Sequence, residues 1–152
     1  LGRTAPPCRT ATTPIGGGAI QNWDVFLRDA IGDQDSPVTG DARARLARTY
    51  GSQQGDITRA LHQDPSLAVP LSDQCPVTKA ELLHAARHEM AVRLSDAVLR
   101  RTEAGSGGHP GAEALHAAAQ VLGDELGWPP DDRAREVADV EQAYRVDPAH
   151  AD

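Results

Sequence analysis

A helix start in the middle of the chain constrains the fold more than any other feature. In the stretch "VTKAELL", Thr78 and Glu81 have the spacing of a capping box, in which two side chains satisfy backbone N–H groups at a helix N-terminus. Val77 stands before the cap and Leu82 follows it, as in a hydrophobic staple. The pattern predicts one long helix that runs from Thr78 to about Glu103.

The composition also favours helices. Aromatic residues make up only 3% of the 152 residues, so alanine, leucine and valine must form the core, and these residues suit helices better than sheets. A chain of this length can bury a core without disulfides. We therefore expect an all-α fold, a compact bundle of five or six helices with an extended N-terminal linker and no sheet.

Caps and stops mark the other expected helices. Asn22 is a candidate N-cap for a first helix, and Thr39 for a second helix from about Asp41 to Tyr50. A third short helix covers "GDITRALHQD". The stretch "AEALHAAAQVLGDELG" predicts a helix closed by Gly127, and a last helix follows "WPPDD", with proline near its first turn.

Proline and glycine divide the chain into parts. Residues 1–19 contain three prolines and four glycines, and we expect a linker from a further domain upstream. Residues 20–147 form the expected helical domain, and residues 148–152 a frayed tail. In "PSLAVPLSDQCP" the apolar residues alternate between prolines, which predicts an extended segment without a partner strand. Those apolar residues are Leu67, Val69 and Leu71.

Charge and cysteine content narrow the function classes. The net charge is −7 and the pI is near 5.3, so the chain repels phosphate backbones and anionic membrane surfaces, and no nucleic-acid partner is expected. Cys8 and Cys75 form no CxxC pair, which favours a reduced, cytoplasmic setting. The sequence contains no apolar run long enough to span a membrane and no signal peptide.

Helical periodicity predicts what the long helix buries and what it exposes. At 100° per residue, one stripe of the helix is apolar and an adjoining flank carries charges. The stripe consists of Leu83, Met90, Leu94 and either Val98 or Ala97; the flank consists of Glu89, Arg93, Asp96 and Arg100. The flank forms two i,i+4 ion pairs, each contributing roughly 0.3–0.5 kcal/mol. Two carboxylates could instead serve acid–base catalysis, but that chemistry needs a cleft, and we favour the structural interpretation.

Two histidines on the same helix are candidate metal ligands. His84 and His88 are four residues apart and Glu89 follows, so both imidazoles could reach one ion. The HExxH motif needs its glutamate beside the first histidine, and the inverted motif needs one where Arg87 stands. Both histidines fall on a polar flank, so we expect solvated side chains and no metal site. Gly16–Gly18 is expected to be a hinge, since no apolar strand precedes it as in a phosphate-binding loop.

The segment "RHEMAVRLSDAVLRRT" resembles the signature of the C-terminal domain of FAD-dependent, aerobic-type glycerol-3-phosphate dehydrogenases. In that signature, glutamate, an aromatic residue or methionine, and alanine or valine precede an acidic residue and Leu-x-Arg-Thr. The matching residues are Glu89, Met90, Ala91, Asp96, Leu99, Arg100, Arg101 and Thr102. "RTYGS", "DPSLAVPLSD" and "ELGW" are similar to further family segments, so the resemblance covers roughly residues 5–146. The chain departs from the family at "EAGSGGHPGAE", where a basic residue and an apolar run are usual.

The resemblance implies a helical domain of an enzyme that oxidises sn-glycerol 3-phosphate to dihydroxyacetone phosphate, with hydride passing to FAD and electrons to quinone. The family's FAD-binding and substrate-binding residues would lie upstream of Leu1, so the resemblance assigns no catalytic, cofactor-binding or metal residue to this chain. Its implied partner is the upstream FAD domain of the same protein, with a homodimer contact as a second possibility and peripheral attachment of the parent at the cytoplasmic membrane as a third.

Two other interpretations of the sequence stay open. The first is a free-standing helical module that binds a protein partner through the exposed side of the long helix. The second is a small metalloprotein that uses His84 and His88.

Overall fold

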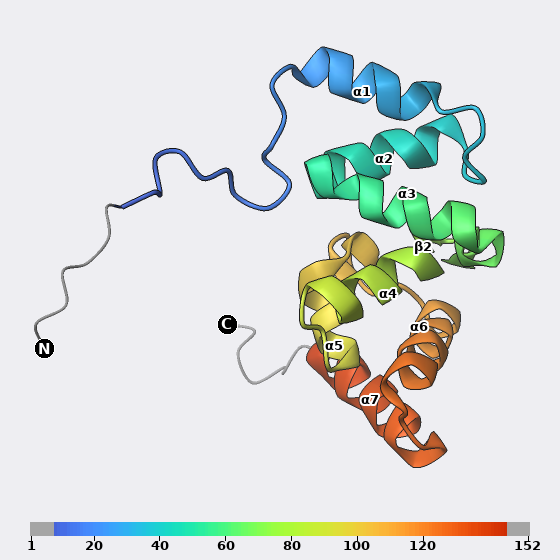
Figure 1. Ribbon diagram of the computed structural model, residues 1–152. Helices are drawn as coiled ribbons and strands as arrows, with labels where there is room; N and C mark the ends of the chain where they lie inside the picture. Colours follow the sequence, from blue (N-terminus) through green and yellow to red (C-terminus); the bar gives the residue numbers. More distant parts are fainter. Residues whose placement is uncertain (1–7, 146–152) are drawn as a thin grey trace, which may run out of the picture. The chain divides into compact units, whose positions relative to one another are not determined.

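A computed structural model describes residues 8–145 of the protein (Figure 1). Contacts divide the chain into two compact units, the first ending at Gly55 and the second beginning at Asp56. The tail predicted for residues 148–152 and the first part of the predicted linker lie outside the described residues. No helix in the described range is both long enough and apolar enough to cross a membrane.

The first unit contains two helices and a short 3-10 turn, namely α1 (Trp23–Gly32), α2 (Gly40–Tyr50) and η1 (Gly51–Gln53). Both predicted N-caps are confirmed, because the side chains of Asn22 and Thr39 each accept a hydrogen bond from a first-turn N–H, at 3.0 and 3.3 Å. The Arg43 guanidinium of α2 donates to the carbonyl of Ile31 near the end of α1 at 2.7 Å. This bond joins the two helices.

The predicted hinge at Gly16–Gly18 packs against the turn that follows α2. The Ser52 N–H donates to the Gly17 carbonyl at 2.9 Å, and Gly51 has a positive φ of 53°. A side chain at Gly51 would overlap the backbone of Gly17, so the close approach of the two segments requires glycine. Gly17 and Gly51 therefore pack backbone to backbone. This packing does not form the open loop that a phosphate-binding site needs.

The second unit surrounds one core. Helix α3 (Gln54–Gln63) begins at the boundary between the units. The elements after it are η2 (Pro65–Ala68), β1 (Pro70–Ser72), β2 (Cys75–Thr78), α4 (Lys79–His88), α5 (Leu94–Asp96), η3 (Ala97–Arg101), η4 (Glu103–Gly105), α6 (Ala112–Leu126) and α7 (Pro130–Ala143). Helix α6 packs against α4, α7 and β1, and these elements are labelled in Figure 1, except β1. Leucine, valine and alanine side chains fill the core, and the predicted all-α fold is confirmed.

The expectation of an unpaired extended segment was wrong in one detail. Strands β1 and β2 pair antiparallel, with Pro70 opposite Thr78 and Ser72 opposite Cys75. Proline is tolerated because both strands are edges of a two-stranded sheet, where a missing N–H need not break a ladder. The Ser72 hydroxyl also accepts from the Cys75 N–H at 3.2 Å and steadies the turn.

The last two helices begin and end close to where their signals predicted. Gly127 follows α6 in the left-handed conformation, with a φ of 71°, and the next N–H, of Trp128, donates to the Gly123 carbonyl at 2.8 Å. Pro130 occupies the first position of α7, where its missing N–H costs nothing.

Candidate functional site

The start of α4 is held by a buried carboxylate. The side chain of Glu81 is fully buried and accepts hydrogen bonds from the backbone N–H of Thr78 at 2.7 Å and from its hydroxyl at 3.0 Å. Val77 and Leu82, the predicted staple, both belong to the core. The predicted helix start at Thr78 is therefore confirmed, and Glu81 serves as a structural acceptor.

The long helix predicted to reach Glu103 ends at His88 instead. The backbone turns left-handed at Met90, with a φ of 60°, and the Ala91 N–H donates to the Ala85 carbonyl at 3.0 Å. The residue that turns left-handed after a helix end is usually glycine, so methionine is unusual at this position. We call residues 89–93 the Met90 turn. It places the Met90 side chain in solvent, at 84% exposure, so the prediction that Met90 lies in the buried stripe was wrong.

The Asp96 carboxylate supplies the reason for the break. It accepts hydrogen bonds from the backbone N–H groups of Val92 and Arg93, at 3.3 and 3.2 Å. These two donors would otherwise lose their partners when α4 ends, because each helix start leaves N–H groups unsatisfied. Asp96 thus stabilises a new helix start at α5, and residues that periodicity places on one continuous helix belong to two.

Arg93 joins the Met90 turn to α7. Its guanidinium donates to Glu136 at 3.0 Å and to Asp139 at 2.6 Å, and the Leu94 N–H donates to the other Glu136 oxygen at 2.8 Å. Leu94 itself is fully buried in the core, as predicted. The expected Glu89–Arg93 ion pair is replaced by these contacts, because the helix that would have aligned the two side chains is interrupted between them.

The end of the signature forms a wide helical turn. The predicted Asp96–Arg100 ion pair is confirmed at 2.7 Å. In η3 the Thr102 N–H donates to the Ala97 carbonyl five residues earlier at 2.9 Å, and the Thr102 hydroxyl donates to the same oxygen at 2.8 Å. Thr102 is buried, and its hydroxyl also accepts from the Ala104 N–H. The threonine therefore closes η3 and starts η4.

The other signature residues divide by burial. Ala91 is fully buried, whereas Leu99 is 38% exposed and both Arg100 and Arg101 are exposed. The signature thus combines groups that fix the backbone with groups that face solvent.

Of the two candidate metal ligands, His88 is exposed as expected, whereas His84 lies in a different environment from the one expected. His84 is buried and not solvated, its ring is 4.9 Å from that of His88, and its Nε2 lies 4.0 Å from a Glu89 carboxylate oxygen. Burial lowers the pKa of His84 below its usual value, and the negative charge of Glu89 only partly opposes this shift. Across the described residues, no three metal-ligating side chains gather closely enough to hold an ion.

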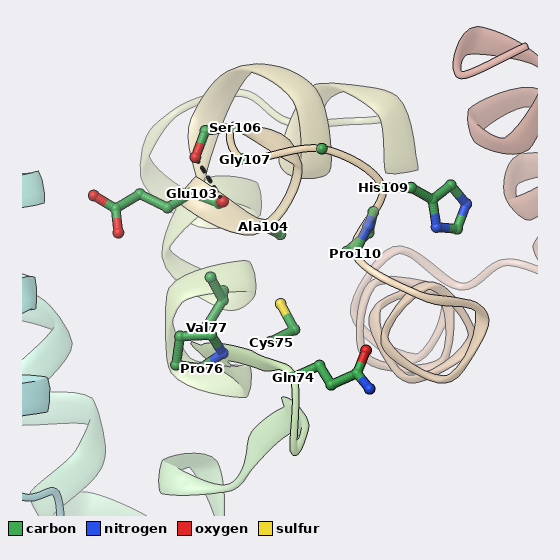
Figure 2. A pocket seen from close by; sticks show the side chains of 11 residues that line it. Gln74, Cys75, Pro76, Val77, Glu103, Ala104, Ser106, Gly107, His109 and Pro110 are labelled. Carbon is green, nitrogen blue, oxygen red and sulfur yellow. Dashed lines mark hydrogen bonds between the residues drawn. The ribbon is translucent and has the colours of Figure 1, made fainter.

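A hollow of about 330 Å³ lies between β2 and the loop after η4 (Figure 2). The sulfur of the buried Cys75 points toward Ala104, while the His109 ring is directed away from it. His109 instead contacts Glu141 of α7 at 3.0 Å. The Ser106 hydroxyl donates to the backbone carbonyl of Glu103 at 2.9 Å. The Ser106 and His109 side chains thus hold the loop in place.

The residues that sequence reasoning missed are the acidic partners in distant helices. Glu136 and Asp139 of α7 bind Arg93, and Glu125 of α6 binds Arg87 through two hydrogen bonds of 2.7 and 2.6 Å. A local pattern search pairs each arginine with an acid three or four residues away. The only available signal was the surplus of acids in the last helix. This surplus does not show which acid lies opposite which arginine.

A family model matches most of the chain. Residues 8–133 match the family model described as the C-terminal domain of alpha-glycerophosphate oxidase. The chain belongs to this family. The predicted resemblance is therefore confirmed, and the segment 89–102 lies well inside the matched range.

The relatives are considerably longer than this chain. A glycerol-3-phosphate dehydrogenase of Synechocystis sp. is 32% identical over 129 residues, which cover 84% of this chain and 23% of the relative. Glycerol-3-phosphate dehydrogenase 2 of Mycobacterium tuberculosis is 34% identical over 94 residues, covering 61% of this chain and 16% of the relative. The chain thus spans less than a quarter of the length of these relatives. No solved structure matches it.

Proposed function

We propose that the chain is the non-catalytic helical C-terminal domain of an FAD-dependent sn-glycerol-3-phosphate dehydrogenase. The observation that carries this proposal is the family match over residues 8–133, together with relatives named as glycerol-3-phosphate dehydrogenases. In the complete enzyme, glycerol 3-phosphate would be oxidised to dihydroxyacetone phosphate, with hydride passing to FAD and electrons to quinone. The domain's work would be to pack on the flavin domain, in the cytoplasm.

The chemistry of the described carboxylates supports a structural role. Glu81, Asp96 and Glu136 each accept backbone N–H groups at a helix start, so their oxygens are already engaged. A general acid or base must instead reach a proton on the substrate. The acids of the signature region are therefore better suited to holding the backbone than to catalysis.

FAD does not fit the glycine-rich stretch of this chain. A dinucleotide-binding loop needs glycines whose N–H groups face the pyrophosphate at a helix N-terminus. Here Gly17 and Gly51 pack backbone to backbone, and a Cβ on Gly17 would lie 2.8 Å from the Tyr50 carbonyl oxygen. We assign the flavin contacts to the upstream part of the enzyme.

The test uses the complete reading frame that contains this chain. We expect the purified protein to show flavin absorbance that bleaches on addition of glycerol 3-phosphate, and to reduce a dye only when that substrate is present. Asp96→Ala should lower the yield of folded protein. The flavin-loaded enzyme that remains should have an unchanged KM for glycerol 3-phosphate. A colourless, inactive full-length protein would contradict the dehydrogenase assignment and favour a helical interaction module.

A further inference from the structure

Among the described residues of the second unit, the Met90 turn presents the most exposed large apolar side chains. Met90 is 84% exposed and Val92, two residues later, is 63% exposed. Ala91 between them is fully buried, so the backbone of the turn is anchored in the core while its neighbours on both sides extend outward. Side chains of this size usually lose water contact on folding, because removing apolar surface from water stabilises the folded state.

The turn is rigid, so its exposure does not come from a frayed helix end. The Ala91 N–H is bound to Ala85, and the Val92 and Arg93 N–H groups are bound to Asp96. Arg93 is in turn fixed on α7. A surface whose backbone is already fixed loses little conformational freedom when a partner covers it.

The sequence of the turn is unfavourable for a domain that stands alone. Met90 is the one described residue other than glycine with a positive φ, a conformation in which the Cβ atom lies too close to the following carbonyl oxygen. Glycine at this position would remove both the strain and the exposed apolar side chain. Strained backbone conformations cluster at functional sites, where contacts of the strained residue offset the cost. Here the described residues make no such contact with the Met90 side chain and leave it in water.

We propose that Met90 and Val92 form a contact by which this domain docks in an apolar hollow on the upstream part of the same polypeptide. This inference rests on the proposed function only in requiring that upstream part, whose activity it does not need. The length of the missing partner supports it, since the matched region makes up only 23% of the Synechocystis relative. Arg93, beside Val92, is already paired with Glu136 and Asp139. Docking in an apolar hollow would therefore leave no unpaired positive charge at its edge.

The experiment measures how accessible residue 90 is in the complete protein. Met90→Cys and, as a matched control, Glu113→Cys are made in the full-length chain, and Glu113 lies exposed in the first turn of α6. Each variant is treated with a maleimide in buffer and in urea. Labelling of the peptide that contains the new cysteine is followed by mass spectrometry, so other cysteines do not interfere. Circular dichroism checks that both variants fold.

We expect the new cysteine of Met90→Cys to label at least about tenfold more slowly in native protein than in urea, since covered groups react only after local opening. The new cysteine of Glu113→Cys should label within about threefold of its urea rate, because an exposed group needs no opening. Equal native rates in the two variants would overturn the proposal. Protection that disappears on dilution together with a dimer would also overturn it, and would identify a second copy as the partner.

The same sample separates this inference from the proposed function. Protection at position 90 in a protein without flavin absorbance and without glycerol-3-phosphate activity would support docking and contradict the dehydrogenase assignment. An active flavoprotein in which the cysteine of Met90→Cys is unprotected would support the dehydrogenase assignment and contradict docking. A second variant, Met90→Gly, keeps the turn and removes the side chain, and it should raise proteolytic cleavage between the domains at least about threefold if docking is lost.

Discussion

The chain on the two sides of His88 has a similar residue composition but folds differently. Before it, α4 is a regular helix whose start is satisfied by Glu81, three residues from its cap. After it, the backbone turns left-handed, restarts as α5 and widens into η3. The first segment finds its hydrogen-bond partners nearby, whereas the second depends on Glu136 and Asp139, more than forty residues away. Local propensity decides a structure only where the partners are also local.

The largest expected effect tests the difference in burial. Leu82→Ala removes a fully buried side chain from α4 and should lower the free energy of unfolding by about 2–5 kcal/mol. Met90→Ala, in the exposed turn, should change it by less than about 0.5 kcal/mol. Urea unfolding followed by circular dichroism measures both. Equal losses would mean that Met90 is buried after all.

The next effect tests the dependence on α7. Glu136→Gln keeps the size of the side chain but loses the charge that binds Arg93 and the Leu94 N–H, and we expect a loss of about 1–3 kcal/mol in unfolding free energy. Glu113→Gln, at an exposed position, is the control and should stay within about 0.5 kcal/mol. A neutral result at Glu136 would show that α5 forms without help from α7.

A smaller effect concerns pH and the buried histidine of α4. Burial lowers the pKa of His84 in the folded chain, so as pH falls below its usual value of 6.5 the unfolded chain takes up the proton first. Stability therefore falls with decreasing pH. The charged or titratable groups near His84, namely Glu81, His88, Glu89 and Asp56, change the size of this effect, but burial is the largest cause.

Thermal melts between about pH 7.5 and 5 measure this dependence. His84→Gln removes the titrating group, so the melting temperature of the wild type should fall more steeply over this range than that of the variant. Parallel curves for the two proteins would show that folding does not change the pKa of His84.

The smallest expected effect is a gain. Met90→Gly relieves the left-handed backbone and should stabilise the chain by about 0.5–1 kcal/mol, measured by urea unfolding. Val92→Gly is the matched control, since its φ is not positive, and it should be neutral or destabilising. If Met90→Gly destabilises as well, the left-handed turn is not the true end of α4.

The sequence predicted those parts of the fold whose causes are short-range. The caps at Asn22, Thr39 and Thr78, the stop at Gly127 and the Asp96–Arg100 pair all depend on residues within four positions of each other. The family signature was likewise recognised from local order. These features could be predicted because their energies are set by local geometry.

The break after His88 could not be predicted in this way. No glycine or proline marks it, and a methionine occupies the position where a left-handed residue is needed. Extending the helix through the break gave the wrong phase, so Met90 was expected inside and His84 outside, the reverse of what the structure has. Asp96 and the acids of α7, which only tertiary packing places beside the turn, together make the interruption favourable.

The bond from the Leu94 N–H to Glu136 has a consequence for how the domain opens. A backbone amide exchanges its hydrogen with solvent only after its acceptor has moved away. The acceptor here belongs to α7, so we expect the amide at the start of α5 to become exchangeable whenever α7 separates from the core. Opening of α7 therefore also releases the start of α5, although the loop after η4 and the whole of α6 lie between them in the chain.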